Sequence, residues 1–242
     1  MTRNVVVTGG GTGIGRAIAE RFAAEGDQVF VLGRRREPLE RLAGKSHRGA
    51  IRPVPVDLTV PGEVVAAAER LAAPTVDVLV NNAGGVVKDA APGTEGVFDA
   101  YRRTIDLNLL SAMMLTEVLW PRLRRPGGRV VNISSIAAQR GGGDAYAAAK
   151  AGLLGWGFGL AGEGGPDGIT VNTVSPGYVQ DTEFFNEQGR SSRHDRLVAE
   201  TLMGRSGTPQ DIASAVFFLA SADASWITGQ VLGVNGGSLL GR

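Results

Sequence analysis

The sequence contains no cysteine and only two histidines among its 242 residues. Without cysteine the chain has no disulfide, no thiolate metal ligand and no cysteine nucleophile. The two histidines, His47 and His194, lie in polar stretches that lack the ligand spacing of a metal site. We therefore expect chemistry that uses neither a bound metal nor a thiol.

Long apolar runs and an excess of one charge are also missing. No run approaches the roughly 18 to 20 apolar residues that cross a bilayer, and the N-terminal residues lead into a β-like run without a signal-peptide pattern. The 25 Lys and Arg residues nearly balance the 24 Asp and Glu residues, which disfavours a nucleic-acid binder. These absences predict a cytoplasmic protein with neither a membrane nor a nucleic-acid partner.

Short β-branched runs alternate with longer helical patterns along the chain. The expected strands are Asn4–Val7, Gln28–Leu32, Ile51–Val56, Val76–Val80, Arg129–Ser134, Thr170–Ser175 and Gln230–Val234. The expected helices are Ile14–Glu25, Pro61–Ala72, Tyr101–Leu123, Tyr146–Gly162 and Pro209–Leu219. Strands that are apolar throughout are buried on both faces, as in a parallel sheet between two helical layers. No linker divides residues 1–242, and the polar stretch Tyr178–Gly207 is either a lid or a mobile loop.

A glycine-rich segment, Thr8-Gly9-Gly10-Gly11-Thr12-Gly13-Ile14-Gly15, lies between the first strand and the first helix. Such a turn brings backbone amides and the positive end of a helix dipole close to a pyrophosphate. The alternative is a tight turn without a ligand, but the strand-turn-helix context favours dinucleotide binding. The expected contacts are Gly9, Gly11, Thr12, Gly13, Ile14 and Gly15.

Arginines follow the second strand where an NAD-binding domain usually has an acidic residue. The segment reads Gly33-Arg34-Arg35-Arg36, and Gly33 stands at the expected position of that acid. Without the carboxylate, a 2′-phosphate is not repelled, and Arg34 or Arg35 provides a planar fork of donors for it. The segment therefore favours NADP(H) over NAD(H), although three arginines also occur in solvated basic turns.

Two further segments lie at the carboxyl ends of strands, where ligands of open α/β sheets bind. Asp57 and Leu58 follow the third strand, and Asn81-Asn82-Ala83-Gly84 follows the fourth. Each segment alone is compatible with a simple turn or helix cap. Their repeated position predicts cofactor contacts at Asp57, Leu58, Asn81, Ala83 and Gly84.

Tyr146 and Lys150 are four residues apart in an expected helix, so their side chains share one face. A nearby cation stabilises a phenolate and lowers the pKa of a tyrosine, which makes the phenol a usable acid or base. The same spacing also occurs by chance, with the tyrosine packed on the core and the lysine solvated.

Taken in order along the chain, these segments resemble the short-chain dehydrogenase/reductase family. The matching positions are Thr8-Gly-x-x-x-Gly-x-Gly15, Asn81-Asn-Ala-Gly84, Asn108, Ser134-Ser135, Tyr146-x-x-x-Lys150, Pro176-Gly177 and Val234-Asn235-Gly236-Gly237. The resemblance implies a single doubly wound α/β domain of the Rossmann type, with seven parallel strands and helices on both faces. It also implies a homotetramer or homodimer, and the glycines in the helix Tyr146–Gly162 are consistent with close packing against a second subunit.

The resemblance assigns roles to four residues in hydride transfer. Tyr146 would protonate a carbonyl oxygen, Lys150 would lower the pKa of that phenol and bind the nicotinamide ribose, Ser135 would hold the substrate oxygen, and Asn108 would order a water. Ser135 is preferred to Ser134 because Ser134 is expected on the other face of the strand.

Further cofactor contacts are implied after the sixth strand. Pro176, Gly177 and Val179 match the segment beside the nicotinamide. The threonine that usually follows corresponds to Thr182, displaced by Asp181, so Val179 is the safer contact.

The function implied is an NADP(H)-dependent oxidoreductase for a small carbonyl or alcohol substrate. The overall pattern is most similar to 3-oxoacyl-[acyl-carrier-protein] reductases, which makes fatty-acid synthesis an alternative. Against it, Asp167 stands where such enzymes have a basic residue, and Arg122, Arg124 and Arg125 either compensate or form the positive end of a helix. A non-catalytic NADP(H)-binding sensor is the other alternative.

Overall fold

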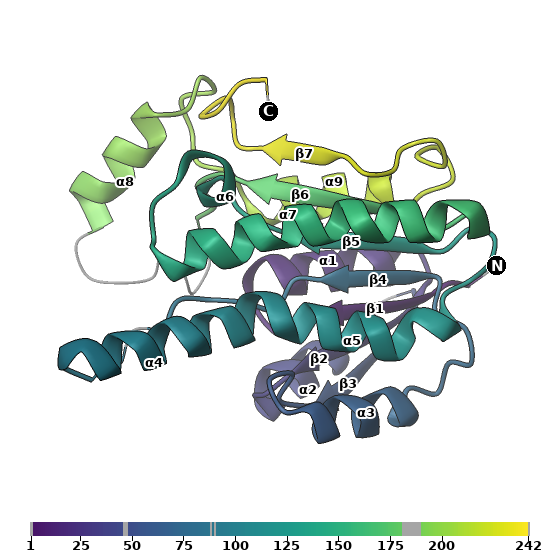
Figure 1. Ribbon diagram of the computed structural model, residues 1–242. Coiled ribbons are helices and arrows are strands. Elements are labelled where there is room, and N and C mark those ends of the chain that lie inside the picture. Colours follow the sequence, from purple (N-terminus) through teal and green to yellow (C-terminus); the bar gives the residue numbers. More distant parts are fainter. Residues whose placement is uncertain (1, 46–47, 88, 90, 181–189, 242) are drawn as a thin grey trace.

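The computed structural model describes residues 2–45, 48–87, 89, 91–180 and 190–241. Its centre is one sheet of seven parallel strands in the order β3-β2-β1-β4-β5-β6-β7 (Figure 1). The strands are β1 (Asn4–Thr8), β2 (Gln28–Gly33), β3 (Ile51–Pro55), β4 (Val78–Asn81), β5 (Arg129–Ile133), β6 (Thr170–Pro176) and β7 (Val231–Val234). The expected single α/β domain of the Rossmann type is confirmed.

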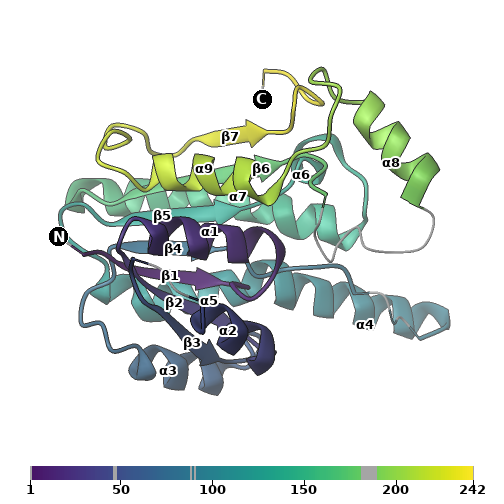
Figure 2. The ribbon, with the colours of Figure 1, turned by 180° about the vertical axis from the view of Figure 1, so that it is seen from behind.

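Helices cover both faces of this sheet. One face carries α1 (Gly13–Ala24), α2 (Arg36–Ala43) and α9 (Pro209–Leu219), which lie in front in Figure 2. The other carries α3 (Pro61–Arg70), α5 (Ser111–Leu119) and α7 (Ala145–Gly164). The remaining α-helices are α4 (Gly93–Ile105), α6 (Ala137–Arg140) and α8 (Arg190–Ala199).

The first strand shows why apolar runs without alternation predict this arrangement. Val5, Val6 and Val7 are all fully buried. Val5 and Val7 belong to the core beneath α1 and α9, whereas Val6 belongs to the core beneath α3 and α5. Because successive side chains of a strand point to opposite faces, a strand covered on both sides needs an apolar residue at every position.

The expected helix Tyr101–Leu123 is wrong at both ends. The helical segment begins at Gly93, passes through a π-helical turn at Asp106–Leu110, and continues as α5 to Leu119. A short 3₁₀ turn, Trp120–Arg122, then ends it. The first turns of α4 are largely exposed, so they lack the apolar period by which a buried helix is recognised.

Two short helices, α2 and α6, were not expected. In α2, charged residues surround Leu39 and Leu42, which alone are buried there, so the apolar signal is weak. The strands, in contrast, lie within two residues of their predicted bounds. In the predicted lid, α8 is helical, and residues 181–189 lie outside the described part of the chain.

Candidate active site

A cavity of about 330 Å³ lies at the carboxyl ends of the strands, next to the point between β1 and β4 where the strand order reverses. This is where ligands bind in doubly wound sheets. The predicted cofactor residues that line it are Gly9, Gly11, Thr12, Gly13, Ile14, Gly15, Arg34, Arg35, Asp57, Leu58, Ala83, Gly84, Pro176, Gly177 and Val179. Ser135, Tyr146 and Lys150 line the same cavity, whereas Thr182 lies outside the described residues.

The glycine loop is shaped by close backbone approach. Gly9 and Gly13 have positive φ angles of 64° and 51°. A Cβ on Gly15 would lie 2.2 Å from the carbonyl oxygen of Gly9, so no larger residue fits there. The N-cap of α1, Thr12, makes no side-chain capping bond, and the first turn has no acidic residue. The free backbone amides and the positive dipole end of α1 therefore remain available to an anion in the cavity.

Asn82, rather than Asn81, faces the cavity. The backbone amides of Asn82 and Ala83 both donate to Thr8 Oγ1 at 2.8 Å, and Asn82 Nδ2 donates to the carbonyl oxygen of Thr8 at 2.8 Å. These bonds join the ends of β1 and β4. Asn82 was not among the predicted contacts. Because neighbouring residues along a strand alternate between the two faces of the sheet, Asn81 and Asn82 point in opposite directions.

Asn81 is therefore a correction to the predicted cofactor contacts. Its side chain is buried on the opposite face, where Nδ2 donates to Asn132 Oδ1 at 2.9 Å and to Thr116 Oγ1 at 3.0 Å. It does not line the cavity. Other lining residues that were not predicted include Pro38, Thr59, Gly85, Leu107 and Ile133.

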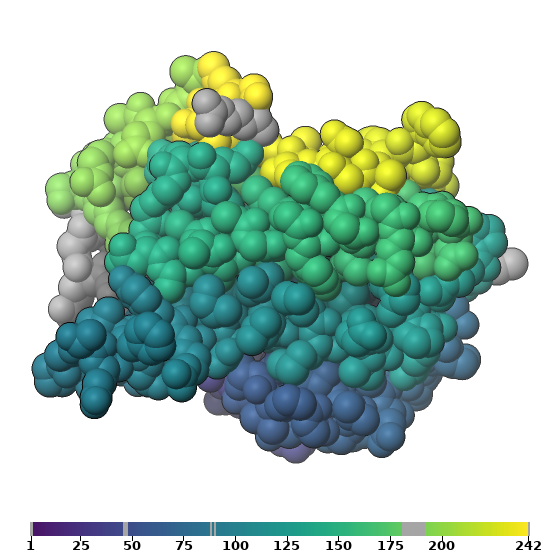
Figure 3. Space-filling model, in the orientation of Figure 1, coloured from purple at the N-terminus to yellow at the C-terminus, as the bar shows by residue number. Residues whose placement is uncertain are grey.

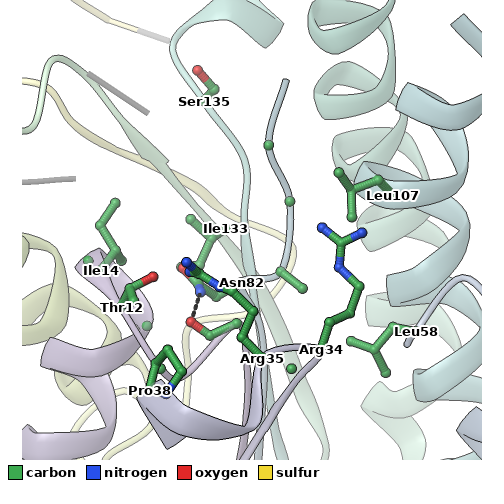
Figure 4. A pocket seen from close by; sticks show the side chains of 18 of the residues that line it. Thr12, Ile14, Arg34, Arg35, Pro38, Leu58, Asn82, Leu107, Ile133 and Ser135 are labelled. Carbon is green, nitrogen blue, oxygen red and sulfur yellow. Dashed lines mark hydrogen bonds between the residues drawn. The ribbon is translucent and has the colours of Figure 1, made fainter. Parts of the chain in front are cut away.

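Arg34 and Arg35 extend into the cavity from the end of β2, and Arg34 lies beside Leu58 (Figure 4). Burial alone would raise the pKa of the nearby Asp57. Hydrogen bonds from the backbone and hydroxyl of Thr59, together with the charge of Arg34, instead hold that pKa below its usual value. One end of the cavity thus combines two cations with a carboxylate that stays ionised at neutral pH.

Tyr146 and Lys150 meet the end of β5. The Ser135 hydroxyl lies beside the Tyr146 phenol, while Lys150 Nζ donates to the carbonyl oxygen of Ile133 at 2.9 Å. Burial raises the pKa of Tyr146, although the neighbouring Ser135 hydroxyl partly offsets the rise. Burial also lowers the pKa of Lys150 to about 8. That Lys150 lowers the phenol's pKa stays a prediction, because in the chain by itself desolvation is the larger effect.

Asn108 is fully buried in the π-helical turn and does not line the cavity. Its Nδ2 donates to the carbonyl oxygens of Gly85 at 2.8 Å and Thr104 at 2.9 Å, and its Oδ1 accepts from the amide of Gly85 at 3.0 Å. The side chain therefore fixes the loop after β4. Its role in ordering a water stays a prediction.

The loop between Ser135 and Tyr146 has an unusual backbone. Gly141, Gly142, Gly143 and Asp144 all have positive φ angles, and Asp144 is the one non-glycine residue of the described chain that does. Such a conformation costs a non-glycine residue about 1–3 kcal/mol. The three glycines adopt these angles at little cost, which lets the connection reach α7.

Side chains on the substrate side are joined to one another. Arg140, at the end of α6, pairs with Glu200 at 2.8 Å, and Tyr178 Oη is hydrogen-bonded to His194 Nδ1 of α8 at 2.9 Å. Both contacts attach the segment around α8 to the rest of the domain. The segment therefore has a defined position beside the active site.

The three arginines that follow α5 lie at the opposite edge of the sheet, near the start of β5. Arg122 donates to the carbonyl oxygens of Ala68 at 2.6 Å and Leu71 at 3.1 Å, which end α3. Arg124 pairs with Asp77, and Arg125 pairs with Asp167 at 2.9 Å. All three are occupied within the chain.

Within the described ranges, no group of three or more His, Cys, Asp or Glu side chains is arranged to hold a metal ion. Across the same residues, no helix has the length and apolar character required to span a bilayer.

Known proteins resemble this chain over nearly its whole length. A family model described as enoyl-(acyl carrier protein) reductase matches residues 9–238. The 3-oxoacyl-[acyl-carrier-protein] reductase FabG of Escherichia coli (strain K12) is 36% identical, and the match covers 96% of this chain and 95% of that protein.

Two solved structures share the fold. A short-chain dehydrogenase/reductase from Brucella melitensis is 32% identical with a TM-score of 0.88, over 99% of this chain and 97% of that one. A blue fluorescent protein from a metagenomic library, crystallised with NADPH, is 36% identical with a TM-score of 0.84, over 98% of this chain and 97% of that one.

Proposed function

This chain belongs to the short-chain dehydrogenase/reductase family, and we propose that it is an NADP(H)-dependent oxidoreductase acting on a carbonyl or alcohol group of a small molecule. The observation that carries the proposal is the convergence of Ser135, Tyr146 and Lys150 on the cavity that also contains the glycine loop. A phenol beside a serine hydroxyl at one end and an anion-binding helix terminus at the other are what hydride transfer to a carbonyl requires.

The residues present fit a phosphorylated dinucleotide. The glycine loop and the start of α1 would hold the pyrophosphate, because no side chain obstructs the amides there. Arg34 and Arg35 would hold the 2′-phosphate, since the end of β2 carries Gly33 in place of the acidic residue of NAD-binding domains. The structural relative crystallised with NADPH supports this choice. NAD(H) is the less favoured cofactor.

When bound, the cofactor supplies or accepts the hydride, and the chain supplies the proton. During reduction Ser135 donates a hydrogen bond to the substrate oxygen, and Tyr146 transfers its phenolic proton to that oxygen as negative charge develops. The raised pKa of Tyr146 keeps the phenol protonated at neutral pH, as a proton donor needs to be. The buried ammonium of Lys150 stabilises the phenolate that remains.

The test is turnover with NADPH and NADH against a panel of ketones that includes acetoacetyl-CoA. We expect NADPH-dependent reduction of at least one ketone, and Tyr146→Phe should lower kcat by at least about a hundredfold because the proton donor is removed. Turnover by Tyr146→Phe at the wild-type rate would refute the assigned role. Binding of NADPH without any turnover by the wild type would instead favour the non-catalytic sensor.

Reduction of a 3-oxoacyl group on an acyl-carrier protein is the second candidate. The similarity to FabG favours it. The occupied Arg122, Arg124 and Arg125 weigh against it, because an acidic carrier protein would have to compete with Asp77 and Asp167 for two of them. A kcat/KM that is much higher for the carrier-bound substrate than for acetoacetyl-CoA would establish this alternative.

A homotetramer or homodimer is proposed from the open face of α7. Gly155, Gly159 and Gly162 lie on this face, where a Cβ added to any of them would have no atom within 4 Å, and Phe158 is 52% exposed. Beside them, a groove between α5 and α7 contains Trp120 and Trp156. Figure 3 shows α7 lying open on the surface. Such an exposed apolar face is suited to a second copy of the chain.

The segment 178–207 is proposed as the substrate lid. The Arg140–Glu200 pair attaches it to the rest of the domain, whereas the Tyr178–His194 contact joins its start to α8. The cytoplasmic location expected from the sequence stays a prediction.

A further inference from the structure

Three consecutive residues at the end of β5 lie against α7, and two of them, Ile133 and Ser134, are hydrogen-bonded to it. The carbonyl oxygen of Ile133 accepts from Lys150 Nζ at 2.9 Å, and the Ser135 hydroxyl lies beside the Tyr146 phenol. Between them, Ser134 Oγ donates to the backbone carbonyl oxygen of Lys150 at 2.8 Å. Lys150 Nζ, Ser135 and Tyr146 are the groups assigned to the chemistry, whereas the Ser134 bond holds only the backbone of the helix.

Ser134 is itself fixed on two sides. Its side chain is only 3% exposed, and its amide donates to the carbonyl oxygen of Val174 on β6 at 2.8 Å. The hydroxyl therefore connects the sheet directly to the turn of α7 that carries Lys150. Since a shift of one helical turn moves the next turn as well, the same bond fixes the position of Tyr146 along the axis of α7 relative to Ser135.

Gly84 shows why the position of α7 along its axis matters. A Cβ on Gly84 would lie 3.0 Å from Lys150 Nζ and 2.6 Å from Asn108 Oδ1, so the ammonium passes close to the loop after β4. A shift of α7 would either press Lys150 onto this loop or draw it away from Ile133. Small displacements of catalytic groups cost large factors in rate.

We infer that Ser134 is a positioning residue of this active site: its hydroxyl holds α7 so that Lys150 and Tyr146 stay in register with Ser135. The inference rests on the proposed function and adds a residue that acts through Lys150. Ser134 transfers no proton, because its hydrogen is engaged by the Lys150 carbonyl.

The test compares Ser134→Ala with Ser111→Ala. Ser111 is a matched control, because its buried hydroxyl also donates to a backbone carbonyl, that of Leu107, at 2.8 Å, but makes no bond to α7. With NADPH and acetoacetyl-CoA, we expect Ser134→Ala to lower kcat about tenfold with KM changed less than about twofold. Ser111→Ala should stay within about twofold of the wild-type kcat.

Two further readouts separate positioning from a general loss of stability. The alkaline limb of the kcat profile should move upward by about half a pH unit in Ser134→Ala. Water would reach the Lys150 ammonium more easily and raise its pKa. Ser134→Thr, which restores a hydroxyl, should recover most of the rate. An unchanged kcat and pH profile in Ser134→Ala would overturn the inference, and so would equal losses in Ser111→Ala.

NADPH binding provides a readout that does not depend on turnover. Because Lys150 is the proposed partner of the nicotinamide ribose, the Kd of NADPH measured by its fluorescence should rise about threefold in Ser134→Ala and stay unchanged in Ser111→Ala. If the wild type shows no turnover, an unchanged Kd of NADPH in Ser134→Ala would overturn the inference. If Ser134→Ala does not fold, Ser134→Cys replaces it and should show the same changes, since a thiol is a weak donor. A wild type that neither binds NADPH nor reduces a ketone refutes the proposed function itself.

Discussion

The ammonium of Lys150 lies 2.9 Å from the carbonyl oxygen of Ile133 and is almost completely enclosed by protein. Among the described residues, no carboxylate lies within 4 Å of it. A buried cation whose partners are neutral costs folding free energy. The active site thus contains a charge that the fold by itself does not favour.

Replacing Lys150 with methionine should stabilise the protein while removing activity. The pKa of Lys150 in the folded chain, about 8, is below its ordinary 10.5. The cost of burying the charge is therefore fully present below pH 8 and disappears as the pH rises through 10.5. After the lost bond to Ile133 is subtracted, Lys150→Met should raise the free energy of unfolding by about 2 kcal/mol at pH 7.

Urea unfolding at several pH values measures this effect. The difference between Lys150→Met and the wild type should shrink as the pH approaches 10.5. A gain that is equal at pH 7 and above pH 10, or a less stable variant at pH 7, would contradict the charge-burial account.

Gly84→Ala should impair both stability and turnover. The added methyl group would lie 2.6 Å from Asn108 Oδ1 and 3.0 Å from Lys150 Nζ, so both groups would have to move. We expect a loss of about 1–3 kcal/mol in the free energy of unfolding and at least a tenfold lower kcat. Gly62→Ala in α3 is the control, because nothing lies within 4 Å there, and it should stabilise by about 0.5–1 kcal/mol. Equal stability of the two variants would exclude a steric role for Gly84.

Arg34→Ala and Arg35→Ala should weaken NADPH binding selectively. Each variant should raise the Kd of NADPH about tenfold and that of NADH less than about threefold, because only NADPH has the 2′-phosphate. Arg36→Ala is the control, since Arg36 is outside the cavity lining and pairs with Glu40 at 3.3 Å. Titration of cofactor fluorescence gives both constants. Equal increases in the Kd of NADPH and of NADH would show that the arginines do not bind the 2′-phosphate.

Gly159→Glu should disrupt assembly without affecting the fold of the single chain. The position has no neighbour within 4 Å inside the chain, so a side chain is excluded only by a second subunit. Light scattering should show the wild type and Gly159→Ala as oligomers and Gly159→Glu as a smaller species. A Gly159→Glu variant of wild-type mass would place the interface elsewhere.

The sequence predicted the sheet well because its central strands are buried on both faces, as Val5, Val6 and Val7 illustrate. It predicted most of the cavity because the glycine loop and the segment after β4 follow strands whose ends meet at one edge. It did not reveal which of Asn81 and Asn82 faces that edge, since this depends on strand alternation and on the bond of Asn82 to Thr8.

Other features depend on three-dimensional surroundings that no local pattern contains. The raised pKa of Tyr146 comes from burial, which a motif of two residues four apart does not report. The start of α4 lies in an exposed stretch without an apolar period. The attachment of α8 through Tyr178 and His194 joins residues from different segments of the predicted lid.

Because all seven strands run in the same direction, their carboxyl ends form one edge of the sheet and their amino ends form the other. The carboxyl edge carries the cavity, whereas the amino edge carries Arg122, Arg124 and Arg125 in contacts within the chain. β1 also begins at the amino edge. An affinity tag or a tether to a solid support attached on that side would leave the mouth of the cavity free, which makes it the edge to choose for immobilising the protein.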